Sequence, residues 1–151
     1  MRKWEMRARL EILDVISRYT WCGDFGEVEA FVACFTPDAV LTVKGGGSFE
    51  GREGLLRLAR GEGSRMDAER LASDGPLHHH VSTHRIELVS KRRARANAYF
   101  LVLNRRGPDH WGRYSDELER RDGHWRLHRR RVSVDGASRG SVPYPDGFAE
   151  S

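Results

Sequence analysis

The sequence predicts a single α+β domain in which three N-terminal helices cover a strongly curved antiparallel sheet, shaped like a cone with one open mouth. Three observations lead to this fold class. Apolar residues recur at helical spacing in the N-terminal part, the second half contains four strand-like segments, and short turns connect those segments. Successive strands joined by short loops form an antiparallel meander. The mouth of such a cone is a natural small-molecule site.

Helical spacing is clearest near the N-terminus. Residues 5–19 are predicted to form the first helix, with apolar residues Leu10, Ile12, Leu13, Val15, Ile16 and Tyr19. We expect Gly23 to end it, as glycine does beyond a helix C-terminus. A second short helix is predicted from the apolar stripe Val28, Phe31, Val32 and Phe35, and Pro37 should stop it. A third helix is expected over residues 52–60.

Strand patterns and turns alternate in the rest of the chain. A short buried strand is expected at residues 39–43, followed by a glycine-rich turn that lacks the order of a phosphate-binding loop. Residues 61–76 are loop-like, with one helical turn predicted at 66–71. The four later strands are predicted at residues 79–89, 94–103, 111–121 and 125–134, the last two joined by the hairpin signal Asp122-Gly123. The domain therefore spans residues 1–134, and residues 135–151 form a tail or flap.

Composition limits the class of protein. The 151 residues are enough for one domain with a real core. No apolar run is long enough to span a bilayer, and no signal-peptide pattern opens the chain, so we expect no membrane association. Cys22 and Cys34 form no CxxC pair, which argues against a disulfide framework or zinc module. We expect reduced thiols and a cytoplasmic protein.

Three consecutive histidines, His78, His79 and His80, stand where a loop turns into a strand. Histidine can act as base, acid or metal ligand near neutral pH. Because side chains alternate across a strand, only one or two of the three can face inward. Three neighbours cannot chelate one ion, and no further ligand is evident, so we expect no metal. A solvated loop edge is the plain alternative.

The residues around Asp24 are compatible with two roles for its side chain. The stretch Asp24-Phe25-Gly26-Glu27 has capping-box spacing, so Asp24 could serve as the N-cap of the second helix. Alternatively, it could be a functional carboxylate. Cys22, two residues earlier, lacks activating basic neighbours and is expected to be a buried structural thiol.

Several segments together resemble the SnoaL-like branch of the nuclear transport factor 2-like superfamily. This group includes scytalone dehydratase, polyketide cyclases, ketosteroid isomerases, hexachlorocyclohexane dehydrochlorinase and bile-acid dehydratase. The resemblance covers residues 12–134 and implies a cystatin-like α+β barrel. Its motifs are Tyr19-Thr20-Trp21-Cys22-Gly23-Asp24, Phe49-Glu50-Gly51-Arg52-Glu53-Gly54, His78-His79-His80-Val81-Ser82-Thr83 and Gly112-Arg113-Tyr114-Ser115-Asp116-Glu117. This fold hosts many chemistries.

The resemblance implies a catalytic dyad. In dehydratase-like members, an aspartate five residues after a helix tyrosine pairs with a histidine opening the first long strand, which maps onto Asp24 and His79, with His80 as the alternative. Gly23 replaces the family's tyrosine, no histidine stands near residues 104–106 where a second pocket histidine is expected, and Tyr114 falls near the pocket asparagine. Scytalone itself is therefore not the expected substrate.

These features predict a cofactor-independent acid–base enzyme. The dyad would dehydrate, isomerise or cyclise a small apolar oxygenated, polyketide- or steroid-like substrate. Tyr114 is the proposed donor to a developing enolate. The aromatic residues Trp21, Phe100 and Trp111 either line the pocket or belong to the core.

Two other classes of function fit the sequence less well. The main alternative is a non-catalytic small-molecule-binding or assembly module of the same fold. The net charge of +4 and the runs Lys91-Arg92-Arg93 and His128-Arg129-Arg130-Arg131 raise the question of nucleic acid, but no RNA-stacking motif accompanies them. We therefore expect no nucleic-acid partner. The resemblance implies a homo-oligomer, a trimer or a dimer.

Overall fold

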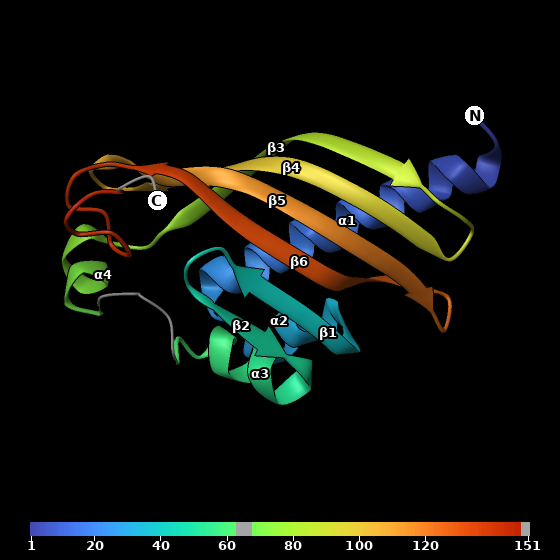
Figure 1. Cartoon of the computed structure of the whole chain (residues 1–151), viewed down its shortest axis with the longest axis horizontal. Coiled ribbons are helices and arrows are strands. Elements are labelled where there is room, and N and C mark those ends of the chain that lie inside the picture. The colour runs from blue at the N-terminus through green and yellow to red at the C-terminus, as the bar shows by residue number, and fades with distance from the viewer. Residues whose placement is uncertain (63–67, 149–151) are drawn as a thin grey trace.

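A computed structural model describes residues 1–62 and 68–148 of the chain. Its strands form one strongly curved sheet in the order β2-β1-β6-β5-β4-β3 (Figure 1). The strands are β1 (Phe35–Val43), β2 (Gly47–Glu50), β3 (His78–Leu88), β4 (Arg93–Asn104), β5 (Gly107–Arg121) and β6 (His124–Ala137). The helices in the described ranges are α1 (Lys3–Phe25), α2 (Val28–Ala33), α3 (Gly51–Ala59) and α4 (Ala68–Asp74). The predicted α+β class with a curved sheet is confirmed.

The sheet is mixed and open, which corrects the expectation of a wholly antiparallel sheet. β1 pairs antiparallel with β2 but parallel with β6. Parallel neighbours need a long connection, and here the chain runs through α3, α4 and the whole meander before β6 returns to β1. The four-strand meander itself is confirmed, and its Asp122-Gly123 turn has positive φ angles of 51° and 81°.

The first helix is longer than the sequence pattern predicts. It continues through Gly23 to Phe25, and Gly26 ends it in the left-handed conformation at φ 68°. A helix tolerates one interior glycine at a cost of about 1 kcal/mol. A Cβ at Gly23 would make only ordinary van der Waals contact, 3.6 Å from the ring of Phe31. Asp24 is therefore inside α1 and is not the N-cap of α2, whose N-cap is Glu27.

Two other boundaries differ from expectation. The second helix ends at Ala33, and Phe35 is already the first residue of β1, where it pairs with Leu127. The helical turn expected at residues 66–71 falls partly outside the described residues, because Met66 and Asp67 are not described. From Ala68 onward the chain is helical, as α4.

The core lies between α1 and the inner face of the sheet. Ile12, Val15 and Ile16 of α1 are fully buried, and each such side chain contributes about 1.5–3 kcal/mol of burial energy. They belong to one apolar cluster with inward-facing residues of the strands, among them Ala94, Ala96, Leu118 and Leu127. A smaller cluster, Leu77, Phe100, Val102, Tyr114 and Val142, fills the end of the sheet near α4 and the tail. Figure 1 shows that the N-terminus and the β3–β4 turn lie at the opposite end.

No helix among the described residues combines the length and apolar character needed to cross a membrane.

Candidate active site

The smaller apolar cluster borders a cavity of about 220 Å³. Its walls come from α1, α3 and all six strands, and from the chain after β6. Most of the lining is apolar, including Leu41, Phe49, Phe100, Val132, Val134 and Pro143. Its titratable side chains are Tyr19, His79, His110, Tyr114 and Tyr144. Such a cavity suits a small, largely apolar ligand with a few polar groups.

Asp24 contacts His79, which lines this cavity. The Nδ1 atom of His79 lies 2.6 Å from Oδ1 of Asp24, and the backbone N–H of His79 donates to Oδ2 at 2.9 Å. The carboxylate is therefore held by two bonds to one residue. Since a carboxylate only accepts, Nδ1 carries the proton in this pair. In neutral imidazole the lone pair is then on Nε2.

The local structure explains why His79 is the member of the histidine run that lines the cavity. Strand alternation leaves His78 and His80 exposed and turns His79 inward. Asp24 reaches it from the last turn of α1, a helix that packs against β3. The contact predicted between Asp24 and His79 is present, and His80 does not line the cavity.

A second Asp–His pair, Asp109 and His110, borders the same cavity. Nδ1 of His110 lies 2.6 Å from Oδ2 of Asp109. The Asp109 side chain is only 2% exposed, and its carboxylate also accepts hydrogen bonds from Asn104 Nδ2, Ser141 Oγ and the Val142 N–H, at 3.1, 2.7 and 3.1 Å. Asp109 thus joins the start of β5 to the chain beyond β6.

Burial acts in opposite directions on the pKa values of Asp109 and His110, because it disfavours the charged form of each group. It opposes ionisation of Asp109, but hydrogen bonds from His110, Ser141 and Val142 outweigh it, so the Asp109 pKa is lowered. Burial also lowers the pKa of His110, although Asp109 acts to raise it. The pair therefore favours an ionised carboxylate beside a neutral imidazole at neutral pH.

His110 corrects the expectation that the pocket lacks a second histidine. Its ring centroid lies 6.3 Å from that of His79, with the planes at 88°, and Phe100 lies beside both rings. Resemblance pointed to residues 104–106, but β5 begins only at Gly107. The sequence signal that points to His110 is strand alternation, because His110 lies two and four residues before the inward-facing Gly112 and Tyr114 and so shares their sheet face.

Tyr114 is buried, lines the cavity and stacks on Phe100 at a centroid distance of 4.7 Å. Burial raises the Tyr114 pKa well above its ordinary value, and burial also raises that of Tyr19. Both phenols therefore stay protonated and can donate hydrogen bonds.

The Arg130 guanidinium lies over both tyrosine rings, at 4.2 Å from the centroid of Tyr19 and 4.0 Å from that of Tyr114. It donates two bonds to the buried carboxylate of Asp116, at 2.8 and 2.7 Å. Its Nη1 is buried and has no hydrogen-bond partner among the described residues. This fully buried ion pair fixes the wall behind Tyr19 and Tyr114.

Two of the predicted aromatic residues lie elsewhere. Trp21 is 60% exposed on the outer side of α1, where it packs on Phe25 at 4.5 Å. Trp111 is 38% exposed because its odd position on β5 points to the other sheet face, and its indole covers Gly136. Phe100, by contrast, lines the cavity as expected. Trp21 and Trp111 therefore neither line the cavity nor belong to the core, which corrects both alternatives expected for them.

The cysteines are free and buried, and neither lines the cavity. Burial raises the pKa of Cys34 to about 11 and also raises that of Cys22, whose thiol contacts Glu27. Raised pKa values disfavour the nucleophilic thiolate. In residues 1–62 and 68–148, no three His, Cys, Asp or Glu side chains are grouped so that they could hold a metal ion.

Known structures share this architecture. A putative scytalone dehydratase from Novosphingobium aromaticivorans is 22% identical, with a TM-score of 0.74 over 99% of this chain and 100% of that one. A type 2 hexachlorocyclohexane dehydrochlorinase (LinA) is 22% identical, with a TM-score of 0.74 over 98% and 93% of the two chains. An NTF2-like protein with a cystatin-like fold, also from N. aromaticivorans, is 23% identical, with a TM-score of 0.75 over 88% and 86%. At these identities the likeness establishes the cystatin-like fold alone.

Among curated proteins, no match was found. The family model of the SnoaL-like domain, however, matches residues 4–131, which include Asp24, both cavity histidines and Tyr114. This match covers most of the chain, and the protein therefore belongs to the SnoaL-like domain family.

Proposed function

We propose that this protein is a cofactor-independent acid–base enzyme of the dehydratase, isomerase or cyclase type, with Asp24 and His79 as its catalytic dyad. The observation that carries the proposal is the 2.6 Å contact between His79 Nδ1 and Asp24 Oδ1 at the edge of an apolar cavity. The mostly apolar walls favour a small oxygenated ring compound, such as a polyketide- or steroid-like molecule, as the substrate.

The dyad acts as a tuned base. With Nδ1–H donated to Asp24, the lone pair on Nε2 of His79 removes a proton next to a substrate carbonyl. The carboxylate stabilises the imidazolium that forms and fixes its orientation. In a dehydration, the imidazolium then gives this proton to the leaving hydroxyl, and the products are an enone and water. General acid–base assistance of this kind contributes ~10²–10⁴-fold to the rate.

Two further cavity groups have polar roles in this proposal. The protonated hydroxyl of Tyr114 donates to the oxygen on which negative charge develops. His110 is neutral and donates through Nδ1 to Asp109, so its Nε2 can accept a hydrogen bond from a substrate hydroxyl. His110 would therefore orient the substrate between the two histidines, whose ring centroids are 6.3 Å apart.

Elimination is the reaction class that we favour. The names of two similar structures, a putative dehydratase and a dehydrochlorinase, both denote removal of a proton together with a neighbouring leaving group. A base, an oriented carbonyl and a second histidine are groups that an elimination can use. Isomerisation would return the proton to another carbon, and cyclisation would use the carbanion as a nucleophile.

A second copy of the chain is the partner that we propose. The sheet face not covered by helices carries Tyr99, Leu101 and Trp111, of which Tyr99 is 55% exposed. Arginines and carboxylates surround them, including the Arg113–Asp135 pair. A homo-oligomer through this face predicts a particle heavier than one 17.3 kDa chain by light scattering. Tyr99→Arg should lower the mass to that of one chain, and a monomeric wild type would contradict the interface.

The test of the enzyme uses a panel of β-hydroxy ketones on aromatic rings and of unsaturated 3-keto steroids, incubated in D₂O. Proton NMR then follows both exchange next to the carbonyl and loss of the hydroxyl. We expect turnover of at least one compound by the wild type, about 10²-fold or more slower exchange with His79→Asn, and no effect of Trp21→Phe. An unchanged rate in His79→Asn would exclude His79 as the base, and saturable binding without turnover by the wild type would instead favour a non-catalytic binding module.

A further inference from the structure

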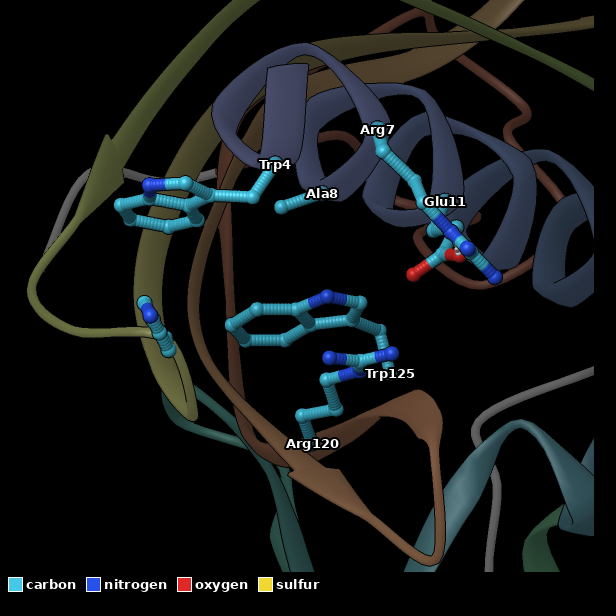
Figure 2. Close-up of a pocket in the computed structure, with 7 residues that line it drawn as sticks. Trp4, Arg7, Ala8, Glu11, Arg120 and Trp125 are labelled. Carbon is cyan, nitrogen blue, oxygen red and sulfur yellow. Dashed lines mark hydrogen bonds and ion pairs between the residues drawn. The ribbon is translucent and has the colours of Figure 1, made fainter. Parts of the chain in front are cut away.

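A second hollow lies at the other end of the sheet, between the first turns of α1 and the ends of the two hairpins. Its volume is about 280 Å³. Trp4, Arg7, Ala8 and Glu11 of α1 form one side. Arg120 from β5 and Trp125 from β6 form the other (Figure 2), together with Lys91 from the β3–β4 turn. From His79 to the end of β3 the chain advances about 30 Å, so this hollow is separate from the cavity of the dyad.

The hollow has aromatic walls. The indole of Trp125 is anchored in the core at 4% exposure and still borders the hollow, while Trp4 is half-buried. In Figure 2 the two side chains project toward the same space from α1 and from β6. Neither indole stacks on another aromatic ring in the part of the chain that the structure describes. The Arg2 guanidinium lies over the Trp4 ring at 5.0 Å from its centroid, and the apolar surface of a flat ring would find partners in Trp125 and in the remaining surface of Trp4.

The rim of the hollow is cationic. Arg7 is paired with Glu11 at 2.7 Å, the one carboxylate in the lining. Lys91 and Arg120 have no ion pair within the described residues, and the Arg120 side chain donates only to the Gly123 carbonyl there, at 3.3 Å. Arginine donors and a lysine ammonium beside an indole are the groups that recognise a phosphate, sulfate or carboxylate on an aromatic ring.

We propose that this hollow binds a small planar aromatic anion, with its ring against Trp4 and Trp125 and its anionic group at Lys91 and Arg120. The volume is at the lower limit of ligand pockets, which restricts the ligand to one or two fused rings. The run of basic residues at the β3–β4 turn would ordinarily be read as solvated charge. The indole-lined hollow lies next to this turn, so the same cations can bind the anionic group of an aromatic ligand.

The test uses 1-naphthyl phosphate as the probe and 1-naphthol as its uncharged match, measured by quenching of tryptophan fluorescence and by calorimetry. We expect saturable binding of the phosphate that weakens as salt rises, and much weaker binding of naphthol. The double variant Lys91→Ala/Arg120→Ala should bind the phosphate at least about tenfold more weakly, which corresponds to 1.4 kcal/mol. Trp4→Ala should also weaken it through loss of ring contact.

The matched control is Arg57→Ala, which removes one exposed cation from α3, away from the hollow. It should bind the probe as the wild type does, and so should His79→Asn, because the dyad lies at the other end of the sheet. Unchanged binding in the double variant, equal affinity for naphthol, or no saturable binding at millimolar probe would each overturn the proposal. Circular dichroism of the double variant checks that the fold is retained.

Discussion

The Asp109 carboxylate accepts a hydrogen bond from the Ser141 hydroxyl at 2.7 Å, and both residues are buried. This bond ties the chain beyond β6 to the start of β5. The tied segment continues into Pro143 and Tyr144, which line the cavity. The expected tail or flap is thus partly fixed, and its attachment point is also the residue that holds His110.

Ser141→Ala should lower the free energy of unfolding by about 1–3 kcal/mol, because a buried carboxylate oxygen loses a donor. Urea unfolding measures this loss. Ser138→Ala is the matched control, since the Ser138 hydroxyl donates to the Pro108 carbonyl at an exposed position. Equal effects of the two substitutions would contradict the special role of the Asp109 attachment.

Asp116→Ala should destabilise the protein by about 3–5 kcal/mol, because it leaves the Arg130 guanidinium buried without its counter-charge. The double variant Asp116→Leu/Arg130→Met should recover most of that loss, since an apolar pair of similar size pays no desolvation cost. Thermal unfolding of the three proteins checks the order. A double variant as unstable as Asp116→Ala would show that packing, and not the unpaired charge, causes the loss.

Alternation along a strand was the most reliable signal in the sequence. On β4, Ala96, Ala98, Phe100 and Val102 stand at alternate positions of the sequence, and all four are buried. The same rule, applied to β5, would have found His110 and excluded Trp111. Local patterns succeed here because the pleat has a fixed period of two residues.

Features that depend on remote contacts could not be read in this way. Two glycines three residues apart look alike in sequence, and only the structure shows that Gly26 and not Gly23 takes the left-handed conformation that ends α1. The parallel pairing of β1 with β6 depends on the path of the whole chain between them. The partners of Asp109 at Ser141 and Val142 are more than thirty residues away. The contact between Asp24 and His79 was found through family resemblance, and its catalytic role stays a prediction.

Stability should fall as the pH falls below about 6.5. Because burial lowers the His110 pKa in the folded state, the unfolded chain takes up a proton first, from its ordinary value of 6.5 downward. Asp109 acts in the same direction, but only near and below its ordinary value of 3.8, since its folded pKa is also lowered. The free energy of unfolding between pH 7 and 5 should therefore decline less in His110→Gln. An equal decline in both proteins would refute the assignment to His110.

Gly112→Ala should be strongly destabilising. A Cβ at this position would lie 2.0 Å from the Ser133 carbonyl oxygen and 2.9 Å from the Phe100 ring. Backbone cannot yield as a flexible side chain does, so we expect a loss at or above the upper end of the about 1–3 kcal/mol typical of overpacking. Gly47→Ala is the control, because a Cβ there meets nothing within 4 Å. Urea unfolding of the two variants compares the positions, and a tolerated Gly112→Ala would contradict the close approach of β5 and β6.

Asp24→Asn is the substitution that separates the electrostatic role of Asp24 from its structural one. An asparagine side chain can still accept the hydrogen bond from the His79 backbone N–H, which Asp24 Oδ2 accepts at 2.9 Å. It carries no charge to stabilise an imidazolium, and its amide group favours the wrong tautomer of His79 when it faces Nδ1. Substrate exchange in D₂O should therefore slow by ~10²–10⁴-fold, while the urea midpoint changes little. Asp24→Ala should lose both the rate and stability, since it also leaves the His79 N–H without its acceptor. An Asp24→Asn protein with the wild-type rate would show that His79 works without its carboxylate, and the dyad would have to be abandoned.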